Sequence, residues 1–301
     1  MADTAVDVAV DFGPDRAVID RALAGFCERY LAAVRSPVSD AIRYSLMGEG
    51  KRLRGILFLR AFEAAGGVGD AAGLAGAIEV VHAYSLVHDD LPCMDDDDVR
   101  RGRPTVHRVH GVSAATAAGL AMVPLAAWCV ADAARELGLG DDVVEAIVRD
   151  LMVASGAGGM IGGQLLDLEG EGRPLALEDL QRIHRAKTGA LITAAATLGG
   201  RAASASPARL EALAKYGAAV GLAFQIADDV LDVTATTDQL GKTAGRDLEL
   251  RKSTYPALLG VEGAKVRAAA LVDEGCTALD AVGLLTPALA RIAQFTVERT
   301  S

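Results

Sequence analysis

Glycine and proline interrupt this chain at recurring intervals, and the segments between them are rich in alanine, leucine and valine, which favour helix over sheet. No useful run alternates β-branched and polar residues, so we expect about nine helical segments and no sheet. The predicted stops are Ser36-Pro37, Ala65-Gly66-Gly67, Leu91-Pro92, Gly138 to Gly140, Gly170 to Pro174, Gly199-Gly200, Thr234 to Gly245 and Thr286-Pro287. The sequence therefore predicts an all-α fold.

The breaks between these segments are too short to be linkers between domains. A chain of 301 residues could hold two domains, but one helical domain over residues 15–301 is the simplest account. Residues 1–14 precede the first helical pattern, and we expect them to be flexible.

Charge and cysteine content limit the partners and the compartment. Thirty basic and 40 acidic residues give a net charge of −10, which disfavours nucleic acid as a partner. The four cysteines lie far apart, without the spacing of a zinc site or a disulfide framework, so we expect free thiols in a reducing compartment. The N-terminus carries acids where a signal peptide would be basic. We therefore expect a cytoplasmic protein.

Residues 111–131 contain no charge and are numerous enough to cross a bilayer. Most of them are small, Pro124 interrupts them, no basic flank follows, and no second such segment exists. We therefore expect a fully buried helix here, with a membrane span as the alternative.

The first acidic segment, from His88 to Arg103, places six aspartates between positions 89 and 98. Two charges about 5 Å apart repel by roughly 3 kcal/mol at an effective dielectric near 20, so the cluster must be solvated or neutralised by a metal. A solvated loop is the simpler alternative. The apolar helical stretch from Ile78 to Val87 leads directly into Asp89, however, and this entry favours a metal site.

The second acidic segment, from Phe224 to Asp232, carries Asp228, Asp229 and Asp232. At 100° per residue, we expect the three carboxylates to converge on one patch. Carboxylate oxygens select hard cations, and Mg²⁺ is preferred because no twelve-residue calcium loop is present.

Basic residues lie beside the glycine breaks and the acidic clusters, as a phosphate ligand would need: Lys51, Arg52, Arg54, Arg100, Arg101, Lys187, Lys242 and Lys252. Two nucleotide motifs fail: residues 241–243 read GKT but Thr236 replaces the required glycine, and Ile161 breaks the dinucleotide pattern in GAGGMIGGQ. We interpret the glycines of the latter segment as allowing close helix packing.

Seven motifs in order now resemble those of trans-isoprenyl diphosphate synthases of the farnesyl/geranylgeranyl type. They run from about residue 45 to 256: GKRLR (50–54), HAYSLVHDDLPCMDDDDVRRGRPTVH (82–107), GGQLLD (162–167), KTG (187–189), FQIADDVLD (224–232), GKTAGRDL (241–248) and KSTYP (252–256). The resemblance implies a helical bundle around a deep central cavity, usually homodimeric, with the two acidic motifs facing each other across its mouth.

The resemblance also implies a role for each matching residue in condensing isopentenyl diphosphate with allylic diphosphates. Mg²⁺ would be held by Asp89, Asp95 and Asp228, with Asp90 and Asp232 supporting. The allylic diphosphate would be held by Arg100, Lys187 and Lys242, and isopentenyl diphosphate by Lys51, Arg54, His82 and Arg101. Lys252 would also bind substrate, and Thr188 and Gln225 would offer oxygen dipoles to the allylic cation.

Product length is predicted from Tyr84, five residues before Asp89. In the resembling family an aromatic residue at this position forms a floor that stops elongation, and Ser85 beside it is too small to do so. We therefore expect farnesyl diphosphate, with geranylgeranyl diphosphate as the alternative. A non-catalytic partner subunit or a terpene cyclase would be expected to lack one acidic motif or the isopentenyl site, and this chain keeps both.

Three positions depart from the family pattern. Glu49 and Gly55 stand where glycine and proline are common, and Leu120 replaces a common aspartate. We expect the last change to alter packing near the cavity.

Overall fold

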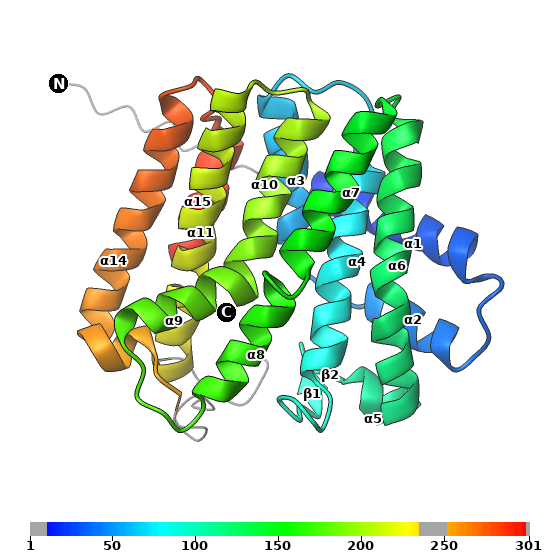
Figure 1. Cartoon of the computed structure of the whole chain (residues 1–301), viewed down its shortest axis with the longest axis horizontal. Helices are drawn as coiled ribbons and strands as arrows, with labels where there is room; N and C mark the ends of the chain where they lie inside the picture. The colour runs from blue at the N-terminus through cyan, green and yellow to red at the C-terminus, as the bar shows by residue number, and fades with distance from the viewer. Residues whose placement is uncertain (1–10, 235–251, 299–301) are drawn as a thin grey trace.

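The computed structural model describes residues 11–234 and 252–298. In these ranges it is a helical bundle with one β-hairpin, whose two strands have two residues each (Figure 1). The all-α prediction is confirmed. The elements are α1 (Gly13–Leu31), α2 (Val38–Leu46), α3 (Leu53–Ala64), α4 (Ala72–Asp89), β1 (Val99–Arg100), β2 (Arg103–Pro104), α5 (Val106–His110), α6 (Val112–Glu136), α7 (Asp141–Ser155), α8 (Met160–Gly170), α9 (Leu177–His184), the π-helix η1 (Arg185–Gly189), α10 (Ala190–Ala202), α11 (Pro207–Thr234), α14 (Tyr255–Asp280) and α15 (Pro287–Glu298).

The core lies between the long helices. Helix α4 packs against α6, α10 packs against both α3 and α11, and α11 packs along α14. Small residues let these helices approach: a Cβ at Gly217 of α11 would lie 2.6 Å from the Cα of Thr193 on α10. Phe58, Ile78 and Met122 fill the space between the helices and are fully buried.

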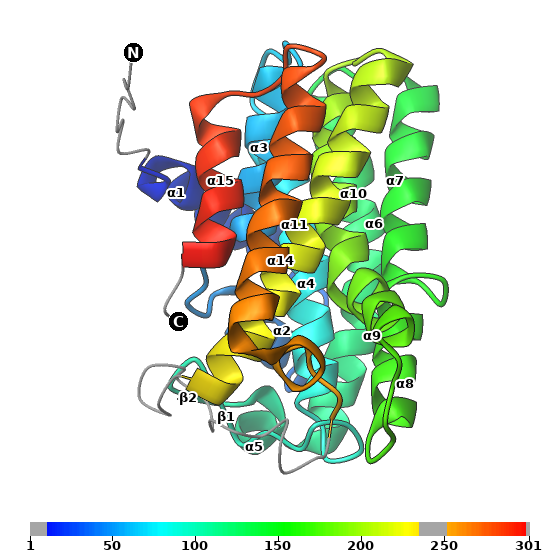
Figure 2. The same cartoon turned by 90° about the vertical axis from the view of Figure 1, so that its left-hand side faces the viewer.

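The ends of two helices bring the acidic segments to the same end of the bundle. Helices α4 and α11 both run downward in Figures 1 and 2 and finish at the lower end, where the β1–β2 hairpin, α5 and the start of α14 also lie. Asp89 is the last residue of α4, and Asp228 and Asp232 lie in the last two turns of α11.

Several predicted boundaries differ from the observed ones. Gly199-Gly200 does not stop a helix, since α10 continues through both residues to Ala202. Glycine is needed at position 199 for another reason: a Cβ there would lie 2.4 Å from the carbonyl oxygen of Phe58. This glycine therefore serves packing against α3. Unpredicted breaks at residues 47–52 and 156–159 make the described helices more numerous than expected. Helix α1 begins at Gly13, close to the predicted start of the domain.

Helix α6 is only partly buried, so the prediction of a fully buried helix for residues 111–131 is wrong. It is the one helix in the described ranges that is long and apolar enough to cross a membrane, and half of its apolar window is buried inside the bundle. Its alanines face the core, whereas Leu120, Pro124 and Trp128, four residues apart, line an exposed face. Leu120 is 63% exposed, so it does not alter internal packing as expected.

Candidate active site

The first acidic segment begins where α4 ends and then turns back through the β1–β2 hairpin. Leu91-Pro92 follows the helix directly, because the residue before a proline avoids helical geometry. The hairpin returns Arg100 to Asp90, where its Nε donates to Oδ1 at 2.6 Å. The same guanidinium lies 3.3 Å from Asp97. The predicted substrate ligand Arg100 is thus paired with the segment's own acids.

Burial disfavours the charged form of the two aspartates at the start of this segment. Burial raises the pKa of Asp89 to about 6, with Asp95 and Asp167 adding to the effect and Lys187 opposing it. Burial likewise raises the pKa of Asp90 to about 6, although Arg100 works against it. Asp95 Oδ1 is buried without a hydrogen-bond partner. Such a cluster favours a bound cation.

Lys187 and Lys252 share one carboxylate, that of Asp167. Their ammonium groups lie 2.6 and 2.9 Å from its Oδ2, and Lys252 also pairs with Glu171 at 3.3 Å. Burial opposes ionisation of Asp167, but the two lysines outweigh it and lower its pKa to about 2. Burial lowers the pKa of Lys187, yet Asp167, Asp89 and Asp95 raise it overall. Lys187 is therefore a charged group placed between Asp167 and the first acidic segment.

Asp167 is a site residue to which the sequence interpretation gave no role. A signal for it was present in Gly163, four residues earlier and hence on the same helix face. A Cβ at Gly163 would lie 2.1 Å from the backbone nitrogen of Lys187, so α8 rests directly on η1. The contact confirms the predicted close helix packing at a glycine of residues 156–164, and it explains why Asp167 faces Lys187.

The π-helix η1 directs Lys187 toward Asp167 of α8 and Thr188 toward Gln225 of α11. Thr188 Oγ1 donates a hydrogen bond to Gln225 Oε1 at 2.7 Å. The structure thus brings together the two residues predicted to offer oxygen dipoles to the allylic cation. Gln164 on α8 is buried, and neither its amide nitrogen nor its oxygen has a hydrogen-bond partner. An unsatisfied buried amide is costly, and this one is suited to a polar ligand.

The second acidic segment does not converge as expected. Asp229 is buried and its Oδ2 accepts from the backbone nitrogen of Tyr255 at 3.0 Å and lies 3.1 Å from His184 Nε2. It is turned about 100° from Asp228 around the helix and serves the α9–α11–α14 junction. Asp232, which is also buried, lies in the last turn of α11. Across residues 11–234 and 252–298, no three acidic, histidine or cysteine side chains are close enough to hold a metal ion.

A cluster of cations lies around His82, near the start of α3 and the first acidic segment. Burial lowers the pKa of Arg54 to about 10, with the charge of Arg101 adding to this effect, and Arg54 Nε is buried without a partner. His82 is held well below its usual pKa, first by burial and then by four guanidinium groups: Arg54, Arg101, Arg100 and Arg52. Arg101 donates to the carbonyl oxygen of Glu49 at 2.8 Å. Neutral His82 and these arginines suit a phosphate ligand.

Lys51 and Arg52, the two basic residues just before α3, have different partners. Lys51 Nζ lies 5.4 Å from the ring centre of Phe295 on α15. Arg52 is buried, pairs with Asp20 at 2.8 Å and donates to the carbonyl oxygens of Leu46 and Gly48. Arg52 therefore fixes the loop rather than opening toward a ligand.

Tyr84 lies on the buried side of α4, one turn before His88. Its side chain is buried, its ring meets the imidazole of His88 edge-on at 5.5 Å, and burial raises its pKa to about 12, with Asp89 adding to the effect. Ser85 Oγ donates to the carbonyl oxygen of His82 at 2.8 Å. Lys242, the remaining predicted ligand, lies outside the described residues.

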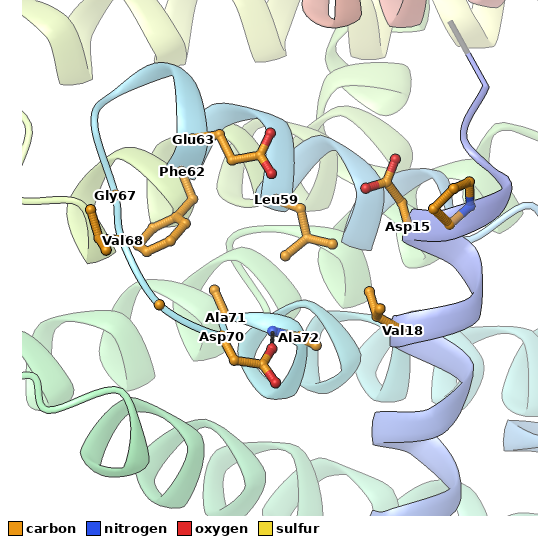
Figure 3. Close-up of a pocket in the computed structure, with 12 residues that line it drawn as sticks. Asp15, Val18, Leu59, Phe62, Glu63, Gly67, Val68, Asp70, Ala71 and Ala72 are labelled. Atoms are coloured by element: carbon orange, nitrogen blue, oxygen red, sulfur yellow. Dashed lines mark hydrogen bonds between the residues drawn. The ribbon is translucent and has the colours of Figure 1, made fainter.

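A separate cavity of about 480 Å³ opens between α1, the end of α3 and the loop before α4 (Figure 3). Asp15, Glu63 and Asp70 line it. It lies at the start of α4, roughly 25 Å along the helix from Asp89. Its three carboxylates would repel a diphosphate, so this cavity is not the candidate site.

Comparison with known proteins now decides the family. The family described as Polyprenyl synthetase matches residues 35–277. The chain belongs to the polyprenyl synthetase family. It is 44% identical to farnesyl diphosphate synthase of Escherichia coli (strain K12) over 271 residues, which cover 88% of this chain and 90% of that protein. It is also 44% identical to a chloroplastic geranylfarnesyl diphosphate synthase of Leucosceptrum canum, over 80% of this chain and 67% of that protein.

Solved structures of polyprenyl synthetases agree with this assignment. An FPP/GFPP synthase from Zymomonas mobilis superposes with a TM-score of 0.82 at 34% identity, covering 94% of this chain and 97% of that one. This polyprenyl synthetase is therefore a prenyltransferase, and the recognition made from the seven motifs is confirmed. The reaction class is trans condensation of prenyl diphosphates.

Proposed function

We propose that this enzyme condenses isopentenyl diphosphate with dimethylallyl and geranyl diphosphates to give farnesyl diphosphate. The observation that carries this proposal is the pairing of two sites at one end of the bundle. One combines acids with Lys187 and Lys252, and the other is an arginine cluster in which Arg54 Nε is buried and unpartnered. A reaction that joins two diphosphate substrates needs two such anion sites.

Mg²⁺ fits the donor chemistry of the acidic site, and because the described carboxylates alone are not close enough to hold it, a diphosphate would have to complete its set of oxygens. The donors are carboxylate oxygens, Asp95 Oδ1 is buried without a partner, and Asp89 lacks sufficient counter-charge. Asp89, Asp95 and Asp228 would hold the ion, with Asp90 and Asp232 supporting. When bound, Mg²⁺ would neutralise charge on the allylic diphosphate as it leaves.

The side chains divide the remaining work. Lys187, Arg100 and Lys242 hold the allylic diphosphate while its C1–O bond breaks, and Thr188 and Gln225 turn oxygen dipoles toward the resulting cation. Lys51, Arg54, His82 and Arg101 hold isopentenyl diphosphate, with Lys252 completing the substrate contacts. The C4 carbon of the isopentenyl unit then forms the new bond to C1. The departing diphosphate accepts the proton that the coupled product loses.

Farnesyl diphosphate is the proposed product because Tyr84 is bulky, buried and one turn from the acids. Geranylgeranyl diphosphate is the second candidate, since relatives of Arabidopsis thaliana at 43% identity are named for that product.

The test is to incubate the purified enzyme with Mg²⁺, isopentenyl diphosphate and geranyl diphosphate and to read product mass. A C15 product that disappears with EDTA is expected. Absence of any condensation product, or full activity in EDTA, would contradict the proposal.

We also propose a homodimer located in the cytoplasm. The exposed apolar face of α6 supports the dimer, because a second copy could cover Leu120, Pro124 and Trp128. The four cysteines are free thiols, as expected in a reducing compartment.

A further inference from the structure

Glu79 is a buried acid for which the proposed reaction has no use. It lies on α4 one turn before His82 and is only 3% exposed. Its neighbours on the helix, Ile78 and Val80, are apolar core residues. A buried carboxylate is costly unless charges or hydrogen bonds compensate it, so its partners indicate its role.

The first partner is the start of α3. Glu79 Oε1 accepts a hydrogen bond from the backbone nitrogen of Gly55 at 2.8 Å. Gly55 is the third residue of α3, where N–H groups have no partner within the helix and carry partial positive charge. The carboxylate therefore caps α3 from the neighbouring helix.

Gly55 is suited to this contact in a way that the family's common proline is not. A proline has no N–H to donate. A Cβ at this position would also lie 2.9 Å from Ile19 Cδ1 and 3.1 Å from the carbonyl oxygen of Ala75. Glycine rather than proline at position 55 therefore permits the hydrogen bond to Glu79.

The second partner is the arginine cluster around His82, which includes Arg54 and Arg101. Burial disfavours the charged forms of Arg54 and Arg101, and Glu79 is the strongest opposing charge on each of them. Arg54 follows Leu53 at the first turn of α3, so the capped turn also carries this side chain. One carboxylate therefore fixes the backbone and balances the charge of the same site.

We infer that Glu79 is a positioning residue for isopentenyl diphosphate: it anchors the first turn of α3, which carries Arg54, and supplies the negative charge that balances Arg54 and Arg101 before that substrate binds. This inference rests on the proposed function. The allylic site depends on Lys187, which is held by Asp167 on a different helix. Glu79 should therefore affect one substrate and not the other.

The experiment compares Glu79→Gln with the wild type. Glutamine keeps an oxygen for Gly55 but removes the charge. We expect the KM for isopentenyl diphosphate to rise about tenfold, with kcat and the KM for geranyl diphosphate within about twofold. The matched control is Asp15→Asn, another buried acid, paired with Arg60 beside the far cavity, which should leave both KM values unchanged.

Calorimetric titration with isopentenyl diphosphate alone gives a readout that does not need turnover. Affinity should fall about tenfold in Glu79→Gln and stay within about threefold of wild type in Glu79→Asp, which retains the charge. The aspartate variant also keeps the test open if the glutamine variant fails to fold. Equal changes in both KM values, or unchanged isopentenyl affinity, would overturn the inference. A wild type that binds isopentenyl diphosphate without condensing it would count against the proposed function instead.

Discussion

Adjacent aspartates at the end of α11 have different surroundings. Asp228 acts on Arg54 through its charge, whereas Asp229 is bonded to Tyr255 and lies against His184. Helical periodicity alone placed them on one patch. The partners of Asp229 lie 45 and 26 residues away in the chain. Only tertiary packing could reveal them, which is why the sequence could indicate an acidic segment on α11 but not the partners of this carboxylate.

Tyr84 is the residue on which product length should depend. Tyr84→Ala removes the buried ring beside His88, and we expect the main product to lengthen from C15 to C20 or more. The cavity should cost a few kcal/mol of stability, on the order of other aromatic-to-alanine changes. Mass analysis of products checks this, with Ser85→Ala as the neighbouring control that keeps wild-type length. An unchanged product from Tyr84→Ala would remove the main support for the C15 assignment.

Asp89 should make the metal-free enzyme less stable as the pH rises. Its pKa is raised to about 6, so the folded chain binds this proton more tightly than the unfolded chain does. Its stabilising contribution is complete below about pH 4, the unperturbed value, and is lost as the pH rises through 6. Asp89→Asn should therefore increase the free energy of unfolding by about 1 to 3 kcal/mol at pH 8 and by little near pH 4.

Urea unfolding in EDTA at pH 4, 6 and 8 measures this difference. Asp141→Asn, at a highly exposed acid on α7, is the control and should show no such trend. A difference between Asp89→Asn and wild type that does not vary with pH would contradict the explanation.

The contact between α8 and η1 shows what a helix pair contributes to the site. Gly163 lets α8 approach the backbone of Lys187, and Asp167 then reaches both lysines. The glycines of residues 156–164 indicated close helix packing. The sequence could not show that the packing partner was η1, because α9 and the loop before it separate α8 from η1 in the chain.

Gly163→Ala should separate these two elements. The added Cβ would lie 2.1 Å from the nitrogen of Lys187, so one element must shift. We expect kcat to fall at least about a hundredfold, comparable to losing a preorganised electrostatic group. Gly158→Ala, where a Cβ meets nothing within 4 Å, is the matched control. Equal kinetics for the two variants would show that the α8–η1 contact is not needed.

For the molecule as a whole, composition and helix stops predicted the fold class, and the ordered motifs predicted the family. The exposure of α6 was not predictable, because a helix with apolar residues on all sides is equally suited to a core and to an interface. The alanine face and the Leu120–Trp128 face differ in side-chain size rather than in polarity.

Trp128→Glu should therefore disrupt the proposed homodimer. Light scattering should give twice the 31.0 kDa chain mass for the wild type and a single chain mass for the variant. Val266→Glu introduces the same charge at an exposed apolar position of α14 and should remain dimeric. A monomeric wild type, or a dimeric Trp128→Glu, would contradict an interface on α6.

Helix α4 carries Glu79, His82, Tyr84 and Asp89 within eighteen residues. The residues proposed to anchor one substrate, to stop the growing chain and to hold the metal for the other substrate are thus spaced along a single helix. We therefore expect α4 to be exchangeable as one unit between relatives with different products. A chimera that receives a donor's residues 72–89 would then take on the donor's product length and keep the same charged residues in place. A shift of α4 by one turn along its axis would displace all three groups at once.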